Sequence, residues 1–208
     1  MIRVHHLNES RSQRVLWLLE ELGAPYEVVP YSRDAATRLA PASLKAVHPL
    51  GKSPIVEDGR VIIAESGAAV EYLSARLGEG RLARSPADDE WPEYIEWLHY
   101  AEGSAMPALL LKMYVSRLGE GGAPLSPRIE GEIANHLGYV EGRLQGRAFF
   151  VGDGLTGADV MMSFVAEVAK ALGALSAYPA FEAWLDRMHA RPAWARAVAR
   201  GGPYRLGD

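Results

Sequence analysis

A serine followed by a proline stands where the chain enters a short apolar strand pattern. The segment His48-Pro-Leu-Gly-Lys-Ser-Pro-Ile-Val places Ser53 and Pro54 directly before that strand. Proline cannot donate to a sheet ladder, so its place there favours a special geometry such as a cis peptide bond. A cis bond would turn the backbone of Ser53 outward, where it could pair with a peptide ligand as an added strand does. An ordinary loop proline is the alternative.

A second pair of polar residues follows eleven positions later. Glu65 and Ser66 end one apolar strand pattern and begin a helical one. Ser66 is a natural N-cap, and the backbone amides beside it could bind a carboxylate. The carboxylate of Glu65 could pair with an ammonium group, so that the two residues together would hold the head group of an α-amino acid. Simple helix capping is the alternative.

Alternating strand and helix patterns must position these residues. Strands are expected at residues 2–7, 26–31, 54–57 and 61–64, and helices at 11–22, 35–47 and 66–77. Pro30 marks the second strand as an edge. Asp58-Gly59 suits a tight antiparallel turn between the last two strands. The order predicts a small mixed sheet with helices packed against it.

The remainder of the chain reads as helices. The polar segment 78–89 contains glycine and proline and marks a boundary between residues 1–79 and an all-helical part at 88–208. Helices are expected at 90–118, 126–144, 158–172, 179–190 and 193–200. Thr156 and Asp159 form a capping-box pattern that fixes the start of the third of these helices, so Asp159 is given a structural role.

Composition excludes several classes of function. With 26 acidic and 22 basic residues and a formal charge of -4, the chain lacks the basic character of a nucleic-acid or membrane-surface protein. The N-terminus lacks a signal-peptide pattern and no segment is apolar enough to span a membrane, so a cytoplasmic location is expected. There is no cysteine, so any reactive sulfur must come from a ligand. No metal site is expected.

Three blocks in order resemble the cytosolic glutathione S-transferase family. They are S-R-S-Q-R-V-L-W-L-L-E-E-L from Ser10, P-L-G-K-S-P-I-V from Pro49, and A-E-S-G-A-A-V-E-Y-L from Ala64. The resemblance extends over essentially the whole chain. It implies an α/β thioredoxin-like N-terminal domain plus an all-α C-terminal helical domain.

The resemblance assigns glutathione contacts to residues of these blocks. The backbone of Ser53, before Pro54, would pair with the cysteinyl part of glutathione, and Glu65 with Ser66 would hold the γ-glutamyl head. Lys52 matches a position that often meets the glycyl carboxylate, where a flexible ammonium is physically reasonable. A solvated surface lysine is the alternative for Lys52.

Activation of the glutathione thiol requires a group that favours the thiolate. Ser10 matches the serine of serine-type members, and its hydroxyl could donate to the sulfur beside the positive end of a helix. Ser10-x-x-Gln13 is also a capping-box pattern, so a structural role stays open. Ser12, Asn8 and His6 are further candidates for the thiol contact.

The second domain should supply the electrophile site. Asn8, Tyr100, Met106 and Tyr114 are candidates to line it, although such aromatic and methionine stripes also fit core packing. Small residues between Tyr100 and Pro107 would permit close helix approach, and the resemblance implies a homodimer.

The resemblance implies a glutathione transferase that attacks small hydrophobic electrophiles. Glutathione-dependent reduction of organic hydroperoxides is the alternative within enzymes, because it needs the same thiolate. A non-catalytic glutathione-binding or protein-interaction member of the same fold is the alternative outside them.

Overall fold

The computed structural model describes residues 1–207, and their contacts group into two compact units. The first unit contains residues 1–83 together with the end of the chain from His189, and the second contains Arg84–Met188. The chain passes from one to the other inside the polar segment 78–89. The last helix contacts the first helix of the chain, which is why the end of the sequence groups with its beginning.

The first unit is built on a four-stranded mixed sheet in the order β2-β1-β3-β4. The strands are β1 (Ile2–Leu7), β2 (Tyr26–Tyr31), β3 (Ile55–Asp58) and β4 (Val61–Ile63). β1 pairs parallel with β2 and antiparallel with β3, and β3 pairs antiparallel with β4. Gly59 occupies the turn with φ of 62°, a conformation that glycine adopts without strain. The expected hairpin and the edge position of Pro30 are confirmed.

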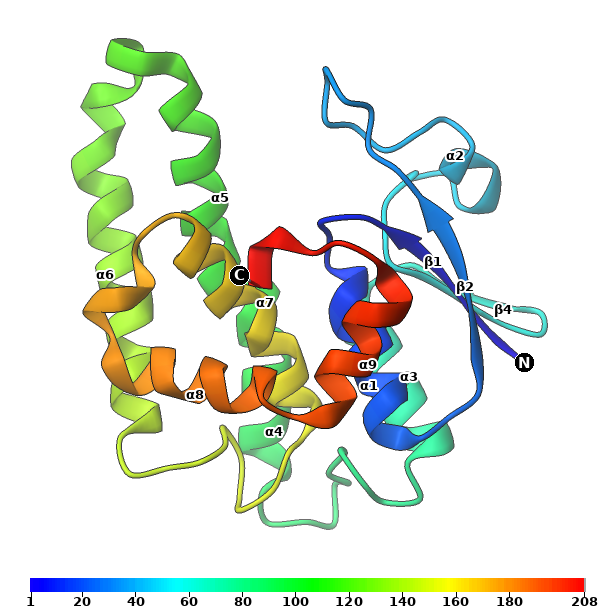
Figure 1. The fold of residues 1–208 in the computed structure, drawn as a ribbon. Helices are drawn as coiled ribbons and strands as arrows, with labels where there is room; N and C mark the ends of the chain where they lie inside the picture. Colours follow the sequence, from blue (N-terminus) through cyan, green and yellow to red (C-terminus); the bar gives the residue numbers. More distant parts are fainter. Residues whose placement is uncertain (208) are drawn as a thin grey trace. The chain divides into compact units, whose positions relative to one another are not determined.

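Three helices of this unit form a layer beside the sheet (Figure 1): α1 (Ser12–Leu22), α3 (Ser66–Leu77) and α9 (Pro192–Gly201). α1 contacts β1, α3 and α9, and most of its residues are buried. It ends at Gly23 in the left-handed conformation, whose amide donates to the carbonyl of Glu20. The helix that carries the Ser10 block therefore lies at the centre of the unit.

The prediction of a helix at 35–47 is wrong for most of that segment. Only α2 (Leu44–Val47) is helical. Asp34 Oδ1 accepts hydrogen bonds from the amides of Ala36 at 3.2 Å and Thr37 at 2.7 Å, which closes a local turn instead of a helix. Arg38 then has φ of 61° and Pro41 follows, so the chain does not return to helical geometry until α2.

The second unit is helical throughout, apart from its loops. Its α-helices are α4 (Trp91–Tyr100), α5 (Met106–Val115), α6 (Ser126–Leu144), α7 (Gly157–Ala171) and α8 (Pro179–His189), the last reaching into the first unit by one residue. 3-10 geometry covers Ser116–Leu125, with a kink at the non-helical Gly119, and the short segments Leu175–Ala177 and, in the first unit, Arg205–Gly207. Figure 1 shows α5 and α6 running side by side, joined by the segment Ser116–Leu125.

The single helix expected at 90–118 is interrupted. A π-helical turn, Ala101–Ala105, separates α4 from α5. Pro107 follows two residues later, and a proline both lacks an N–H and crowds the carbonyl four residues before it. The wider π turn accommodates that crowding.

The capping box at the start of α7 is confirmed. Thr156 is the N-cap, and Asp159 Oδ2 accepts from its amide at 2.9 Å and its hydroxyl at 3.0 Å. The other carboxylate oxygen accepts from the amide of Phe150 at 3.0 Å and the indole of Trp184 at 3.3 Å. Asp159 thus ties a loop and α8 to the buried helix α7. Burial raises the pKa of Asp159 to about 6, while these four donors act in the opposite direction.

Candidate functional site

A chain of three hydrogen-bonded side chains lies where β1 passes into α1. Ser10 Oγ lies 2.8 Å from Ser12 Oγ, and Ser12 Oγ lies 2.8 Å from His6 Nδ1. The amide of Ser12 also donates to Ser10 Oγ at 3.3 Å. Ser12 is fully buried, while His6 and Ser10 are 3% and 5% exposed. Three of the four candidates for the thiol contact, Ser10, Ser12 and His6, therefore form one connected network.

The sequence pattern that gave Ser10 a capping role does not form a capping box. Arg11 is the N-cap of α1, and no side chain caps that end. The Ser10 carbonyl accepts from the amide of Gln13 at 3.1 Å, and Ser10 Oγ accepts from the amide of Ser12 at 3.3 Å. The Ser10 hydroxyl also belongs to the network, beside the first turn of α1. A hydroxyl in this place lies near the positive end of the helix macrodipole.

The histidine of this network is held in its neutral form. Burial lowers the pKa of His6 to about 4, against a smaller opposing effect of the Gly201 carbonyl, which accepts a hydrogen bond from the ring. The neighbouring His5 faces the other side of the sheet, where it contacts Tyr31 Oη at 2.9 Å and Glu57 at 3.0 Å. Adjacent residues of a strand point to opposite faces of the sheet, so His5 and His6 cannot bind one metal ion together.

At the start of α3, Glu65 and Ser66 have different structural roles from those expected from the sequence. Glu65 is the N-cap, in an extended conformation, and Ser66 is the first helical residue, so the assignment of Ser66 as N-cap is wrong. Ser66 Oγ accepts a hydrogen bond of 2.5 Å from Arg14 Nη2. Arg14 is 1% exposed. A buried guanidinium therefore lies under the helix start where a carboxylate ligand was expected, with exposed Glu65 beside it.

The Ser53–Pro54 peptide bond is cis, which is one of the two geometries that the sequence left open. Ser53 Oγ donates to the carbonyl of His5 at 2.8 Å and accepts from the amide of Leu7 at 3.1 Å, which fixes this turn against β1. Lys52, the preceding residue, is exposed. The glutathione contacts expected of Lys52, Ser53 and Pro54 stay predictions.

The four candidates for the electrophile pocket lie in different surroundings. In the first unit, Asn8 Oδ1 accepts from the amide of Arg33 at 2.8 Å. In the second unit, Tyr100 Oη lies 2.8 Å from His136 Nδ1, Met106 is 1% exposed, and Tyr114 is 56% exposed. Their grouping into one pocket stays a prediction.

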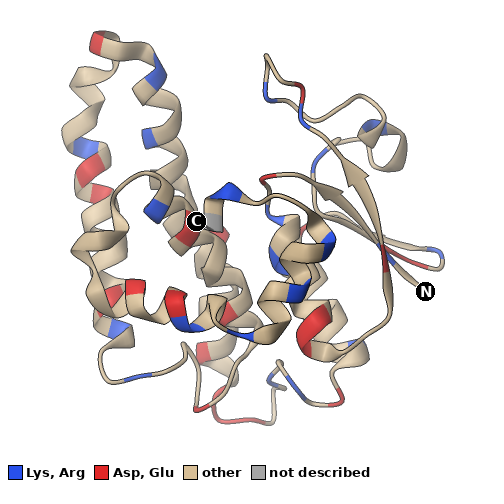
Figure 2. Cartoon of the chain, in the orientation of Figure 1, with Lys and Arg blue, Asp and Glu red and all other residues tan. Residues whose placement is uncertain are grey.

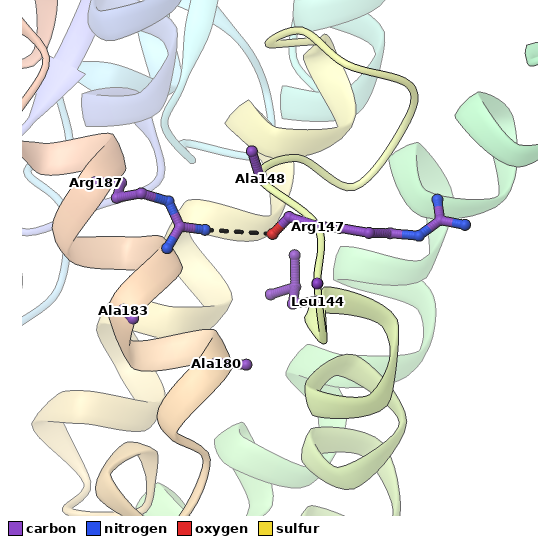
Figure 3. A pocket seen from close by; sticks show the side chains of 7 residues that line it. Leu144, Arg147, Ala148, Ala180, Ala183 and Arg187 are labelled. Atoms are coloured by element: carbon purple, nitrogen blue, oxygen red, sulfur yellow. Dashed lines mark hydrogen bonds between the residues drawn. The ribbon is translucent and has the colours of Figure 1, made fainter.

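A surface pocket of about 410 Å³ lies in the second unit, between the end of α6 and α8. It is lined by Leu144, Gly146, Arg147, Ala148, Ala180, Ala183 and Arg187. Figure 3 shows the Arg187 side chain pointing toward the backbone of Arg147, whose carbonyl it reaches at 3.5 Å, while the Arg147 side chain extends away. None of the predicted site residues lines this pocket. It contains no hydroxyl or imidazole that could act on a thiol.

Residues 1–207 contain neither a candidate metal site nor a helix that could cross a membrane. No group of three or more histidine, aspartate or glutamate side chains is arranged to hold a metal ion among these residues. No helix within the same range has the length and apolar character needed to cross a membrane.

Sequence reasoning missed Arg14 as part of the site and missed that His6 and Ser12 act together. Arg14 lies on the same helical face as Leu18 and Leu22, and a charged residue on an apolar stripe signals a buried partner. The partner of His6 could not be read in the same way, because Gly201 lies almost two hundred residues later.

Both parts of the chain match families of known proteins. The family model described as the glutathione S-transferase N-terminal domain matches residues 1–75, and that of the C-terminal domain matches residues 98–192. Glutathione S-transferase 1 of Saccharomyces cerevisiae is 34% identical, over 94% of this chain and 93% of its own. Glutathione S-transferase 3 of Schizosaccharomyces pombe is 34% identical over 79% of this chain and 72% of its own.

A solved structure agrees with these relatives. A glutathione S-transferase from Actinobacillus pleuropneumoniae has 32% sequence identity and a TM-score of 0.89, and the match covers 99% of this chain and 94% of that one. The match includes both the mixed-sheet unit and the helical unit. The chain therefore belongs to the glutathione S-transferase family.

Proposed function

We propose that the protein is a glutathione transferase that binds glutathione on its first unit and activates the thiol with Ser10. The observation that carries the proposal is the buried hydroxyl of Ser10 at the start of α1, connected to Ser12 and His6. A donor to the sulfur at a helix N-terminus favours the thiolate, which is the nucleophilic form. The chain has no cysteine, so glutathione supplies the reacting sulfur.

The γ-glutamyl head of glutathione is assigned to the start of α3. Its carboxylate would accept from backbone amides there, supported by the positive charge of Arg14 behind Ser66, and Glu65 would pair with its ammonium. Ser53 would pair its backbone with the cysteinyl part, and Lys52 would meet the glycyl carboxylate. With these assignments, the cysteinyl sulfur would lie near the end of β1, where the chain turns into α1.

Calorimetric titration with glutathione tests the binding assignment. Glu65→Ala and Ser66→Ala should each weaken binding by about tenfold or more, because each removes a polar contact to a charged group. Glu71→Ala, an exposed change one turn later on α3, is the matched control and should bind as the wild type does. Unchanged affinity in both site variants would refute the head-group assignment.

Screening of substrates separates the alternatives. Conjugation of small hydrophobic electrophiles such as aryl halides or epoxides supports the transferase, with proximity and thiol activation as its main contributions. Turnover of organic hydroperoxides alone supports a glutathione-dependent peroxidase. Binding of glutathione without turnover of either class supports a non-catalytic member of the fold.

The homodimer and the cytoplasmic location implied by family membership belong to the same proposal. Sedimentation at micromolar concentration tests the first, with a species of twice the chain mass expected and a monomer as the contradicting result. Fractionation of the producing cells tests the second.

A further inference from the structure

The hydrogen-bond network at Ser10 does not end on the second serine but continues to a buried imidazole. The contacts at the His6 end indicate which group donates at each step of this network. His6 is neutral, and the carbonyl of Gly201 accepts a hydrogen bond from its ring. Nδ1 is the nitrogen that faces Ser12, at 2.8 Å, so the proton toward Gly201 is on Nε2. Nδ1 therefore presents a lone pair to Ser12.

This tautomer fixes the direction of both hydroxyls. Ser12 has a single hydroxyl proton, and Nδ1 of His6 at 2.8 Å is a closer acceptor for it than the Leu7 carbonyl at 3.3 Å. The contact of 2.8 Å between the two serine oxygens then needs its proton from Ser10. In the free protein Ser10 thus donates inward, toward Ser12, and presents a lone pair on its other side. The opposite tautomer would place the Nε2 lone pair against the Gly201 carbonyl and is excluded by repulsion.

A thiol that approaches Ser10 consequently meets an acceptor. On the basis of the proposed function, we propose that the thiol proton of bound glutathione is transferred through Ser10 and Ser12 to Nδ1 of His6. The S–H bond breaks and its electron pair stays on sulfur as the thiolate. Ser10 takes this proton and passes its own to Ser12, which passes its own to the imidazole. One Nδ1–H bond forms, and no oxidant or further reactant is needed.

The transfer reverses each hydrogen bond without losing any. Afterwards the imidazolium donates to Ser12, Ser12 donates to Ser10, and Ser10 donates to the thiolate. Nε2–H remains bonded to Gly201. The sulfur thus acquires the hydroxyl donor that activation requires, whereas the free-state direction would favour the protonated thiol. The same path in reverse can return a proton to a product oxygen, as the opening of an epoxide needs.

The surroundings of His6 suit a group that takes up a proton only in response to a nearby anion. α1 presents Ser12 to it, α9 presents Gly201, and β2 places Pro30 beside it in the register. Its low pKa arises from burial, and the Gly201 carbonyl is the one opposing influence. A thiolate at the far end of the network supplies the opposite charge that raises the pKa of an imidazole.

Replacement of His6 by asparagine separates proton uptake from support of Ser12. In His6→Asn an amide oxygen can still accept from Ser12, but it cannot be protonated at neutral pH. We expect a fall in kcat of about 100-fold, typical of a lost general base, and a matching loss of the thiolate absorbance of bound glutathione. Glutathione affinity should stay within about twofold, because no binding group is removed.

Two further variants complete the comparison. Ser12→Ala interrupts the same path, so it should lower kcat to a similar extent, and the double variant should lose no more than either single one. His5→Asn is the matched control, since His5 lies on the same strand but faces the other side of the sheet. Wild-type values of kcat and thiolate absorbance in His6→Asn would overturn the proposal.

Nitrogen NMR of the wild-type protein tests the transfer without any variant. Addition of glutathione should shift the ring nitrogens of His6 to the values of an imidazolium at neutral pH, whereas S-methylglutathione, which has no thiol proton, should not. A neutral His6 in the presence of bound thiolate would overturn the proposal. Failure of the proposed function is distinguishable, because the wild type would then show neither glutathione binding nor conjugation.

Discussion

Replacement of Asp159 by alanine removes the acceptor around which the second unit is assembled. The carboxylate accepts from the amide and hydroxyl of Thr156, the amide of Phe150 and the indole of Trp184, at 2.9 to 3.3 Å, and it is fully buried. In Asp159→Ala these four donors lose their acceptor, and a small cavity is left where the carboxylate had been. The change acts at once on the N-cap of α7, on the preceding loop and on α8.

The size of the effect follows from two opposing contributions. An unsatisfied buried donor costs about 1–3 kcal/mol, and three of the four donors here are N–H groups that cannot rotate to other partners. Against this, alanine removes the cost of burying a carboxylate whose pKa is raised to about 6. We expect a net loss of about 3 kcal/mol in the free energy of unfolding at pH 7. For a chain of this length that corresponds to a fall in Tm of roughly 6–12 °C.

The pH dependence has a definite sign. The pKa of Asp159 is about 6 in the folded protein and ~3.9 in an unfolded chain, so the folded state holds the proton more tightly. The protonated Asp159 therefore stabilises the folded state. This stabilisation is complete below about pH 4 and is lost as the pH rises through 6. The stability difference between wild type and Asp159→Ala should therefore widen by about 2 kcal/mol from pH 7 to pH 4.

Urea denaturation followed by tryptophan fluorescence measures both effects. The exposed Asp153, in the loop before α7, provides the control Asp153→Ala, which should change stability by less than about 0.5 kcal/mol. A loss below about 1 kcal/mol for Asp159→Ala at pH 7, or a difference that narrows toward acid pH, would refute the reasoning.

Two further predictions concern the docking of α9. Gly201→Ala should destabilise the end of α9 by about 1–3 kcal/mol, because the new Cβ would lie 2.6 Å from Gln13 Oε1, 3.0 Å from Leu16 Cδ1 and 3.2 Å from His6 Cε1. Faster amide exchange in α9 would report this loss. Glu21→Ala should lower stability by about 1 kcal/mol, because Arg191 binds both carboxylate oxygens, at 2.6 and 2.9 Å; equal urea midpoints for this variant and Glu71→Ala would contradict that expectation.

The local features of the fold could be predicted from the sequence because short-range patterns determine them. α6 begins and ends at the expected residues, Ser126 and Leu144, since its apolar spacing and its flanking breaks are unambiguous. The capping box of Thr156 and Asp159 was readable for the same reason. The segment from Asp34 to Pro41 was misread, because an aspartate that closes its own turn competes with helix formation over the same residues.

Long-range contacts could not be predicted in this way. Figure 2 shows acidic residues at the end of α1 and basic residues on α9, and the ion pairs of Glu21 with Arg191 and Glu20 with Arg196 join them. No spacing in the sequence indicates that these helices meet. The contact of Gly201 with His6 depends on that meeting. The sequence therefore predicted the residues of the candidate site one by one, and only the fold shows the hydrogen bonds that connect them.

The pKa of the glutathione thiol, measured by thiolate absorbance on the wild type and on Ser10→Ala, tests the central claim most directly. In the wild type the pKa should lie below the ~8.5 typical of a free thiol. Loss of a hydroxyl bonded to an anion costs about 1.5–3 kcal/mol, so Ser10→Ala should reduce the thiolate present at pH 7 by about 10- to 100-fold, with glutathione affinity nearly unchanged. A bound thiol that titrates as free glutathione does, or identically in both proteins, would contradict the account.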